Sequence, residues 1–180
     1  MGMDLYGQHP SFEALRPQEP IETYDSNSPT WVDYHNKMAD FRELPGVYYR
    51  SNMWWWRPIV MFLEENADDI LNRDDINGLS HNSGYLIDAV KAALLSDRLK
   101  LAIQEGYVAA WVAKYKDMQD NAEPEPCWNC DAVGFSNGDP CRICDTKGTV
   151  RNFITNYPTN EEVFESFEDF VHHSGGFEVW

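Results

Sequence analysis

The chain has 180 residues, of which 43% are hydrophobic and 14% aromatic, which is enough to bury one core but not two large ones. Its 14 Lys and Arg residues are outnumbered by 30 Asp and Glu residues, so the formal net charge is −16. Because such a chain repels a phosphate backbone, we do not expect direct nucleic-acid binding through a basic surface. The sequence lacks an apolar run of the roughly 20 residues that span a membrane, and it starts without the pattern of a signal peptide. We therefore expect a soluble, cytoplasmic protein with no membrane partner.

The first predicted elements are a loop, a helix, a strand and a second helix. Residues 8–29 contain four prolines and show no hydrophobic period, so we expect a loop. Between 31 and 41, apolar residues recur three and four positions apart, which predicts a short helix. The β-branched and aromatic segment 46–52 predicts a strand. Pro58 and the apolar residues that follow it as far as Leu71 predict a helix with proline in its first turn.

The middle of the chain predicts a loop and two amphipathic helices. Residues 77–84 are polar and are bracketed by glycines, which indicates a loop. The hydrophobic pattern then predicts helices at about 85–95 and 97–118, with Ser96 or Asp97 as the cap of the second.

The last third predicts a linker, a helix and a terminal strand. Residues 119–126 are acidic and contain two prolines, which indicates an extended linker. A capping-box pattern at 159–162 opens a helix with an apolar face, and Gly175 and Gly176 end it. Residues 177–180 predict a returning strand.

Four cysteines, Cys127, Cys130, Cys141 and Cys144, form two Cys-x-x-Cys pairs that are separated by ten residues. This spacing predicts one structural zinc ion bound by four thiolates, with no open coordination position for catalysis. A glycine lies four residues after the second cysteine of each pair, where a permissive backbone can turn amides toward the sulfurs. A redox dithiol is a weaker alternative, because it would leave the second Cys-x-x-Cys pair, at the spacing of a zinc ribbon, as a coincidence. Two disulfides are also weaker, because they would require an oxidising compartment.

The cysteine segment resembles the zinc ribbon of DnaJ-type chaperones, whose repeats run Cys-x-x-Cys-x-Gly-x-Gly. Here Ala132 and Thr146 replace the first glycine of each repeat, only two repeats exist, and no His-Pro-Asp tripeptide marks a co-chaperone. A chaperone-like role would require clients to bind near Trp128 and Phe135. We predict an α+β fold, mostly helical with a small β-sheet and an inserted zinc ribbon. The predicted domains are residues 1–122 (helical domain with an N-terminal loop), 123–152 (ribbon) and 153–180 (helix and strand returning to the main domain).

Three adjacent tryptophans and an arginine, Trp54 to Arg57, form the most unusual local feature. Their side chains cannot all enter one core, because successive residues point in different directions on either a helix or a strand. We favour an aromatic corner of the core. The alternative is a binding site in which one of Trp54, Trp55 and Trp56 stacks a nucleobase and Arg50 or Arg57 holds a phosphate.

Three further sets of residues are candidates for binding. His81 and Asn82 could hold a ligand, although a solvated loop is the favoured interpretation. His172 and His173 end the last predicted helix, where they could bind a metal, although the favoured interpretation is that they complement the helix dipole. The same helix predicts a strongly acidic surface, which is formed by Glu161, Glu162, Glu165, Glu168 and Asp169.

Several segments together resemble a family of small tailed-bacteriophage proteins. They are the N-terminal MGMDLYG, the segment GVYYRSN, the WWWRP motif, the cysteine pairs and the ending SGGF. The resemblance implies an accessory phage product in the cytoplasm of the bacterial host. We expect a non-catalytic acidic protein that binds and inhibits a bacterial host or defence protein, in one version as a nucleic-acid mimic. The alternative is a protein that sequesters a nucleotide signal with its Trp and Arg cluster; an enzyme is not expected.

Overall fold

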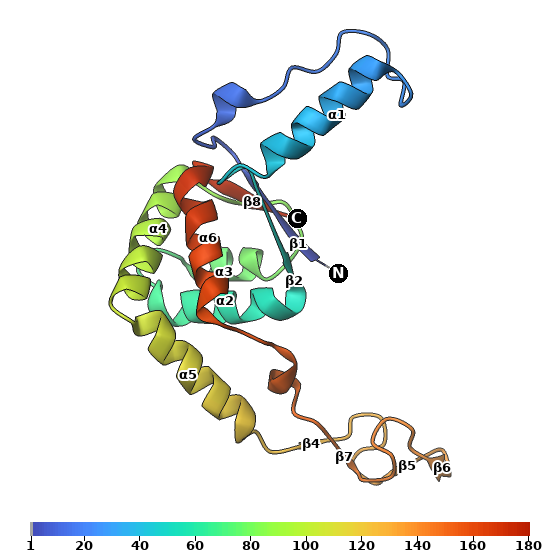
Figure 1. Cartoon of the computed structure of the whole chain (residues 1–180). Helices are drawn as coiled ribbons and strands as arrows, with labels where there is room; N and C mark the ends of the chain where they lie inside the picture. The colour runs from blue at the N-terminus through green and yellow to red at the C-terminus, as the bar shows by residue number, and fades with distance from the viewer. Residues whose placement is uncertain (1) are drawn as a thin grey trace.

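The computed structural model describes residues 2–180 and has the predicted α+β fold, in which helices are packed around a small antiparallel sheet (Figure 1). The described residues form the helices α1 (Pro29–Arg42), α2 (Met53–Asn66), α3 (Arg73–Leu79), α4 (Ala89–Gln104), α5 (Tyr107–Asp120) and α6 (Glu161–Ser174). The main sheet consists of β1 (Gly2–Gly7), β2 (Tyr48–Asn52), β3 (Tyr85–Ile87) and β8 (Phe177–Val179). No helix in residues 2–180 is both long and apolar enough to cross a bilayer.

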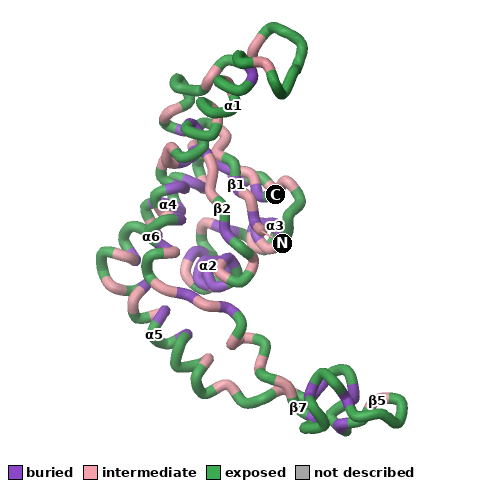
Figure 2. Tube along the Cα trace, turned by 45° about the vertical axis from the view of Figure 1, so that its right-hand side comes forward, coloured by how far each residue is buried: buried purple, intermediate pink, exposed green. Residues whose placement is uncertain are grey.

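The main sheet has the strand order β2-β1-β8-β3, and every neighbouring pair is antiparallel. The first and last strands of the chain are therefore the two central strands, and Leu5 lies opposite Val179. Helices α2 and α6 pack against β1, and α4 packs along α6. The core between these elements is aromatic, and it includes the fully buried Phe62, Phe164 and Phe177. Figure 2 shows that α2 is largely buried, whereas α1 is mostly exposed.

Several predicted elements are confirmed. Residues 8–28 form a loop that contains only one 3₁₀ turn, Glu13–Leu15, and α1 and β2 follow as expected. Helix α6 is also confirmed, but its cap is Asn160 rather than Thr159, because the Asn160 side chain accepts from the Val163 amide at 3.1 Å. Gly175 ends this helix with φ +61°, and β8 returns to the sheet.

The predicted start of the second helix is wrong. Helix α2 begins at Met53, because the Asn52 side chain accepts from the amides of Trp54 and Trp55 at 3.0 and 3.1 Å. Pro58 therefore lies inside the helix rather than in its first turn. The helix ends at Asn66, so it does not reach Leu71.

The elements predicted between residues 77 and 118 are also partly wrong. The segment predicted to open a helix at 85 is strand β3, which pairs with β8, and Asp88 instead caps α4 through the Lys91 amide. The helix continues through Ser96 and breaks at Gly106, which has φ +75°. Helix α3 was not predicted: it begins after Leu71, where the second helix was expected to end, and its last three residues, 77–79, fall in the predicted loop.

The cysteine segment is an insertion between α5 and α6 that projects from the main domain (Figure 1). Two short strands, β4 (Glu125–Pro126) and β7 (Thr149–Val150), pair at its base. A second pair, β5 (Phe135–Ser136) and β6 (Asp139–Pro140), forms its tip. At the opposite end of the molecule, α1 and the loop before it form another projection.

Candidate functional site

The four cysteines form one buried cluster. Their sulfur atoms all lie within 4.8 Å of one another, with 3.8 Å between Cys127 and Cys141 and 3.6 Å between Cys130 and Cys144. A tetrahedron with Zn–S bonds of about 2.3 Å has sulfur–sulfur edges of about 3.8 Å. The sulfur positions are therefore compatible with one four-coordinate structural zinc ion.

Two backbone knuckles with matching geometry hold the sulfurs. The amide of Gly134 donates to the Cys130 sulfur at 3.2 Å, and the amide of Gly148 donates to the Cys144 sulfur at 3.3 Å. A side chain at Gly134 would place its Cβ 2.4 Å from the Thr146 carbonyl oxygen, and one at Gly148 would place it 2.3 Å from that of Ala132. The knuckles thus pack so closely that both positions require glycine.

Ala132 and Thr146, which replace the first glycine of each DnaJ-type repeat, also occupy equivalent positions in the two knuckles. Both adopt a left-handed backbone, with φ +65° and +63°. Their amides donate to the carbonyl oxygens of Cys127 and Cys141, respectively. The hydrogen bonds that close the knuckles therefore form despite the replacements, at the cost of some backbone strain.

The environment of the sulfurs differs between the two pairs. The side-chain amide of Asn129 donates to the Cys141 sulfur at 3.3 Å. This hydrogen bond is the main cause that lowers the pKa of Cys141 to about 6. Burial raises the pKa of Cys130 to about 12. Because a metal ion binds thiolates, the hydrogen bond from Asn129 favours the metal-binding form of Cys141.

Apolar side chains on the outside of the ribbon are exposed. Trp128 is 74% exposed, and Phe135 is about half exposed. Val133 and Ile143 are also exposed, so four large apolar side chains face solvent on a segment of about 25 residues. These side chains are therefore accessible to solvent on one projecting element.

The structure separates the three tryptophans. Trp56 is 2% exposed and donates from its indole nitrogen to the Leu79 carbonyl at 2.7 Å, so it belongs to the core. Trp54 is 46% exposed and packs against Tyr157 and Phe153, with ring centroids 5.4 and 6.1 Å away. Trp55 is half-buried and borders a shallow depression on another side of α2.

The two arginines of the proposed nucleotide site are likewise apart. Arg57 lies over the Tyr157 ring, 5.4 Å from its centroid, and donates to the Tyr157 hydroxyl at 3.2 Å. Arg50 is exposed on β2, 3.6 Å from the Asp4 carboxylate, and borders the same depression as Trp55. The cluster of the sequence is therefore divided between two surfaces, with Trp54 and Arg57 on one and Trp55 and Arg50 on the other.

The surface beside Arg57 contains a cleft. It has a volume of about 460 Å³ and lies between α2 and the 3₁₀ helix η2 (Phe153–Asn156) at the base of the ribbon. Its lining is partly apolar, with Met3, Met53 and Met61, and partly polar, with Glu64 and Glu125. No signal in the sequence predicted this cleft, because η2 and α2 are about a hundred residues apart.

His81 and Asn82 follow α3 and are exposed. The His81 ring donates from Nδ1 to the Asn77 carbonyl at 2.8 Å, and the Asn82 amide donates to the Gly2 carbonyl at 2.6 Å. Neither residue lines the cleft. Their side-chain hydrogen bonds connect the turn to backbone, as the solvated-loop interpretation expects.

The acidic surface of α6 is exposed over most of its length. Glu161, Glu162, Glu165 and Asp169 face solvent, whereas Glu168 is half-buried. Ser96 of α4 donates to the Glu168 carboxylate at 2.9 Å, and its oxygen lies 3.1 Å from Nδ1 of His172. This serine is 2% exposed, so it joins two helices and is inaccessible to a substrate.

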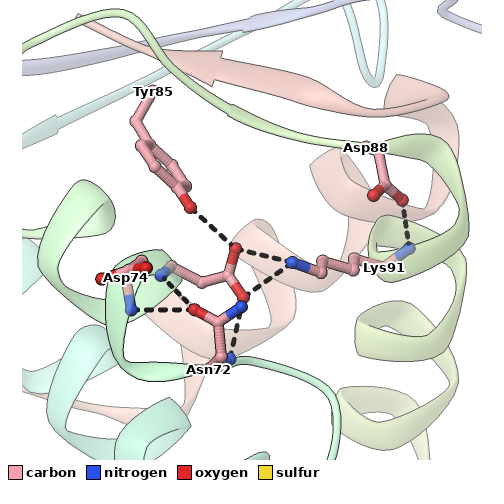
Figure 3. Close-up of polar contacts among 6 residues, drawn as sticks. Asn72, Asp74, Tyr85, Asp88 and Lys91 are labelled. Atoms are coloured by element: carbon pink, nitrogen blue, oxygen red, sulfur yellow. Dashed lines mark hydrogen bonds and ion pairs between the residues drawn. The ribbon is translucent and has the colours of Figure 1, made fainter.

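One buried polar cluster was not predicted (Figure 3). The Asp75 carboxylate is 1% exposed and accepts from the Lys91 ammonium at 2.7 and 2.8 Å. It also accepts from the Tyr85 hydroxyl at 3.0 Å and from the backbone amide of Asn72 at 2.8 Å. It therefore connects α3, β3 and α4. The capping-box spacing of Asn72 and Asp75 is a local signal that could have located the helix start, but not the pairing with Lys91.

Comparison of the chain with protein-family models, with curated proteins and with solved structures finds no match. The resemblance to tailed-bacteriophage proteins therefore stays a prediction.

Proposed function

We propose that this protein is a non-catalytic, acidic binding protein that is stabilised by one structural zinc ion and inhibits a bacterial host or defence protein in the bacterial cytoplasm. The observation that carries the proposal is the exposed acidic face of α6, formed by Glu161, Glu162, Glu165 and Asp169. In a chain of net charge −16, such a face attracts a basic protein surface and accelerates association at low salt.

The cysteine cluster supports a structural rather than a catalytic role for the metal. Cys127, Cys130, Cys141 and Cys144 would supply all four ligands, so a tetrahedral zinc ion would have no position left for water or substrate. The ion would instead hold the two knuckles together. The exposed Trp128 and Phe135 would then be presented on a rigid element, where they can serve as apolar anchors for the partner.

The charge density of α6 bears on the nucleic-acid-mimic version. Residues 161–169 span about 12 Å of helix axis, over which duplex DNA displays about seven phosphates. Four exposed carboxylates are a little over half that number. This density supports a complementary acidic surface, and complete mimicry would require carboxylates from further elements.

Native mass spectrometry of zinc-loaded, tagged protein captured from bacterial lysate tests the proposal. We expect one zinc ion per chain and a stoichiometric basic partner whose capture falls as salt increases from 50 to about 300 mM. The triple variant Glu161→Gln, Glu162→Gln, Glu165→Gln should lose most of this capture. The matched control is the triple variant Asp68→Asn, Glu105→Gln, Asp120→Asn, which removes three exposed charges elsewhere.

The control should retain the partner, because it changes net charge equally but leaves the α6 face intact. Equal loss in both triple variants would show that net charge alone acts. Undiminished capture by the α6 variant would contradict a role for the acidic face.

A further inference from the structure

We infer that the cleft between α2 and η2 binds a basic peptide segment of a partner protein that inserts one large apolar side chain between two Lys or Arg residues. This inference rests on the proposed function and specifies the surface and the chemistry of its partner. The cleft volume of about 460 Å³ lies within the range of about 300–1,000 Å³ that is typical of ligand sites.

The walls of the cleft suit an apolar anchor of variable shape. Met53, Met61 and Ile154 are partly exposed in its lining, and the buried Met3 and Val60 complete the apolar part. Methionine side chains are flexible and polarizable, so they adapt to different apolar groups and contact aromatic rings favourably. An aromatic or branched aliphatic side chain is therefore the group that the interior fits.

The charges at the cleft favour cations over anions. Glu64 is exposed, and Glu125 is half-buried with its carboxylate accepting from the Phe153 amide at 3.3 Å. The only positive side chain among the lining residues is Arg57, which already donates to the Tyr157 hydroxyl at 3.2 Å. The lining therefore holds two carboxylates and one guanidinium, and this excess of negative charge, in a chain of net charge −16, complements flanking Lys or Arg residues.

The same geometry disfavours a nucleotide as the occupant. Trp56 lines the cleft but is 2% exposed, and its indole nitrogen is bound to the Leu79 carbonyl. Trp54 packs against Tyr157 and Phe153, which cover part of the surface that a base would use. A nucleotide phosphate would also lie near Glu64 and Glu125.

The methionines provide the assay. We would label their methyl groups with ¹³C in the full-length, zinc-loaded protein and titrate it with acetyl-Lys-Phe-Lys-amide. The probes for comparison are acetyl-Glu-Phe-Glu-amide, acetyl-Lys-Gly-Lys-amide and ADP. We expect the Lys-Phe-Lys peptide to shift the resonances of the partly exposed Met53 and Met61, and to leave those of Met38 and Met118, which lie outside the cleft, unchanged.

Charge variants test the electrostatic part. Glu64→Gln and Glu125→Gln should each weaken Lys-Phe-Lys binding by about two- to fivefold, because each removes one partly exposed charge contact. The control Glu105→Gln removes an exposed carboxylate at the end of α4 and should leave the affinity unchanged. An unchanged urea unfolding midpoint verifies that each variant is folded.

Three results would overturn the inference: no shift of the cleft methionines at 10 mM peptide, equal binding of the Glu-Phe-Glu peptide, or stronger binding of ADP than of the Lys-Phe-Lys peptide. The last result would establish the nucleotide alternative. The titration uses purified protein and defined peptides, so a negative result would contradict only the inference about the cleft. Loss of salt-dependent partner capture from lysate would contradict only the proposed function of the acidic face.

Discussion

Replacing the Asp75 carboxylate should destabilise the main domain far more than replacing the adjacent Asp74. Asp75→Ala leaves the Tyr85 hydroxyl and the Asn72 amide without their acceptor, at about 1 kcal/mol each. It also removes the partner of the Lys91 ammonium, and because the Lys91 side chain is 29% exposed and can reach water, we assign about 1–2 kcal/mol to this loss. The expected total is about 3–4 kcal/mol.

Urea unfolding at pH 7 with saturating zinc measures this cost. With a denaturant slope of about 2 kcal/mol/M, the midpoint should fall by about 1.5–2 M. Asp74→Ala is the matched control, because Asp74 is also an acidic residue in the first turn of α3 but is exposed. It should cost less than about 1 kcal/mol, which is the usual size of a charge–helix dipole effect.

The destabilisation should also depend on pH. Burial raises the pKa of Asp75, but hydrogen bonds from Lys91, the Asn72 amide and Tyr85 outweigh it and hold this pKa below its ordinary value of 3.8. A lowered pKa means that the contribution is present above about pH 4 and is lost as pH falls through the folded-state pKa. Equal costs for the Asp75 and Asp74 variants, or a cost that persists undiminished at pH 2, would refute this reasoning.

Three further predictions concern the ribbon and the tryptophans. Removal of zinc by a chelator should abolish hydrogen-exchange protection at residues 127–148 and leave α2 and α6 protected, as measured by mass spectrometry. The reason is that the four cysteines, with Val150 packed against them, form a cluster separate from the main core. Loss of protection in the main domain as well would contradict this prediction. Gly148→Ala should lower zinc affinity about 10- to 100-fold in a chelator competition, because a Cβ at this position meets the Ala132 carbonyl. Gly138 also has a positive φ but has open space around it, so Gly138→Ala should change the affinity by less than threefold. Trp56→Ala should lower the free energy of unfolding by about 3–5 kcal/mol, and Trp54→Ala by less than about 1 kcal/mol, because Trp56 is buried and Trp54 is half-exposed. Similar costs for the two variants would contradict this difference in burial.

The features that the sequence determined are those that depend on residues close together in the chain. The cysteine ligands lie within 18 residues, and their spacing specifies two knuckles that can form wherever the segment is placed. Helix α6 has a cap, a continuous apolar face and a terminating Gly175 within 16 residues. In each case the signal and the structure that it specifies occupy the same short stretch.

Tertiary structure decided the remaining features, because their partners are distant in sequence. The residues of β3 have enough apolar character for a helix, and they form a strand because β8, ninety residues later, supplies the hydrogen bonds. Trp56 is buried and Trp54 is half-exposed because η2 and the core approach α2 from different sides. The pair of Asp75 and Lys91 and the cleft beside Arg57 arise in the same way, since each requires two elements that only folding brings together.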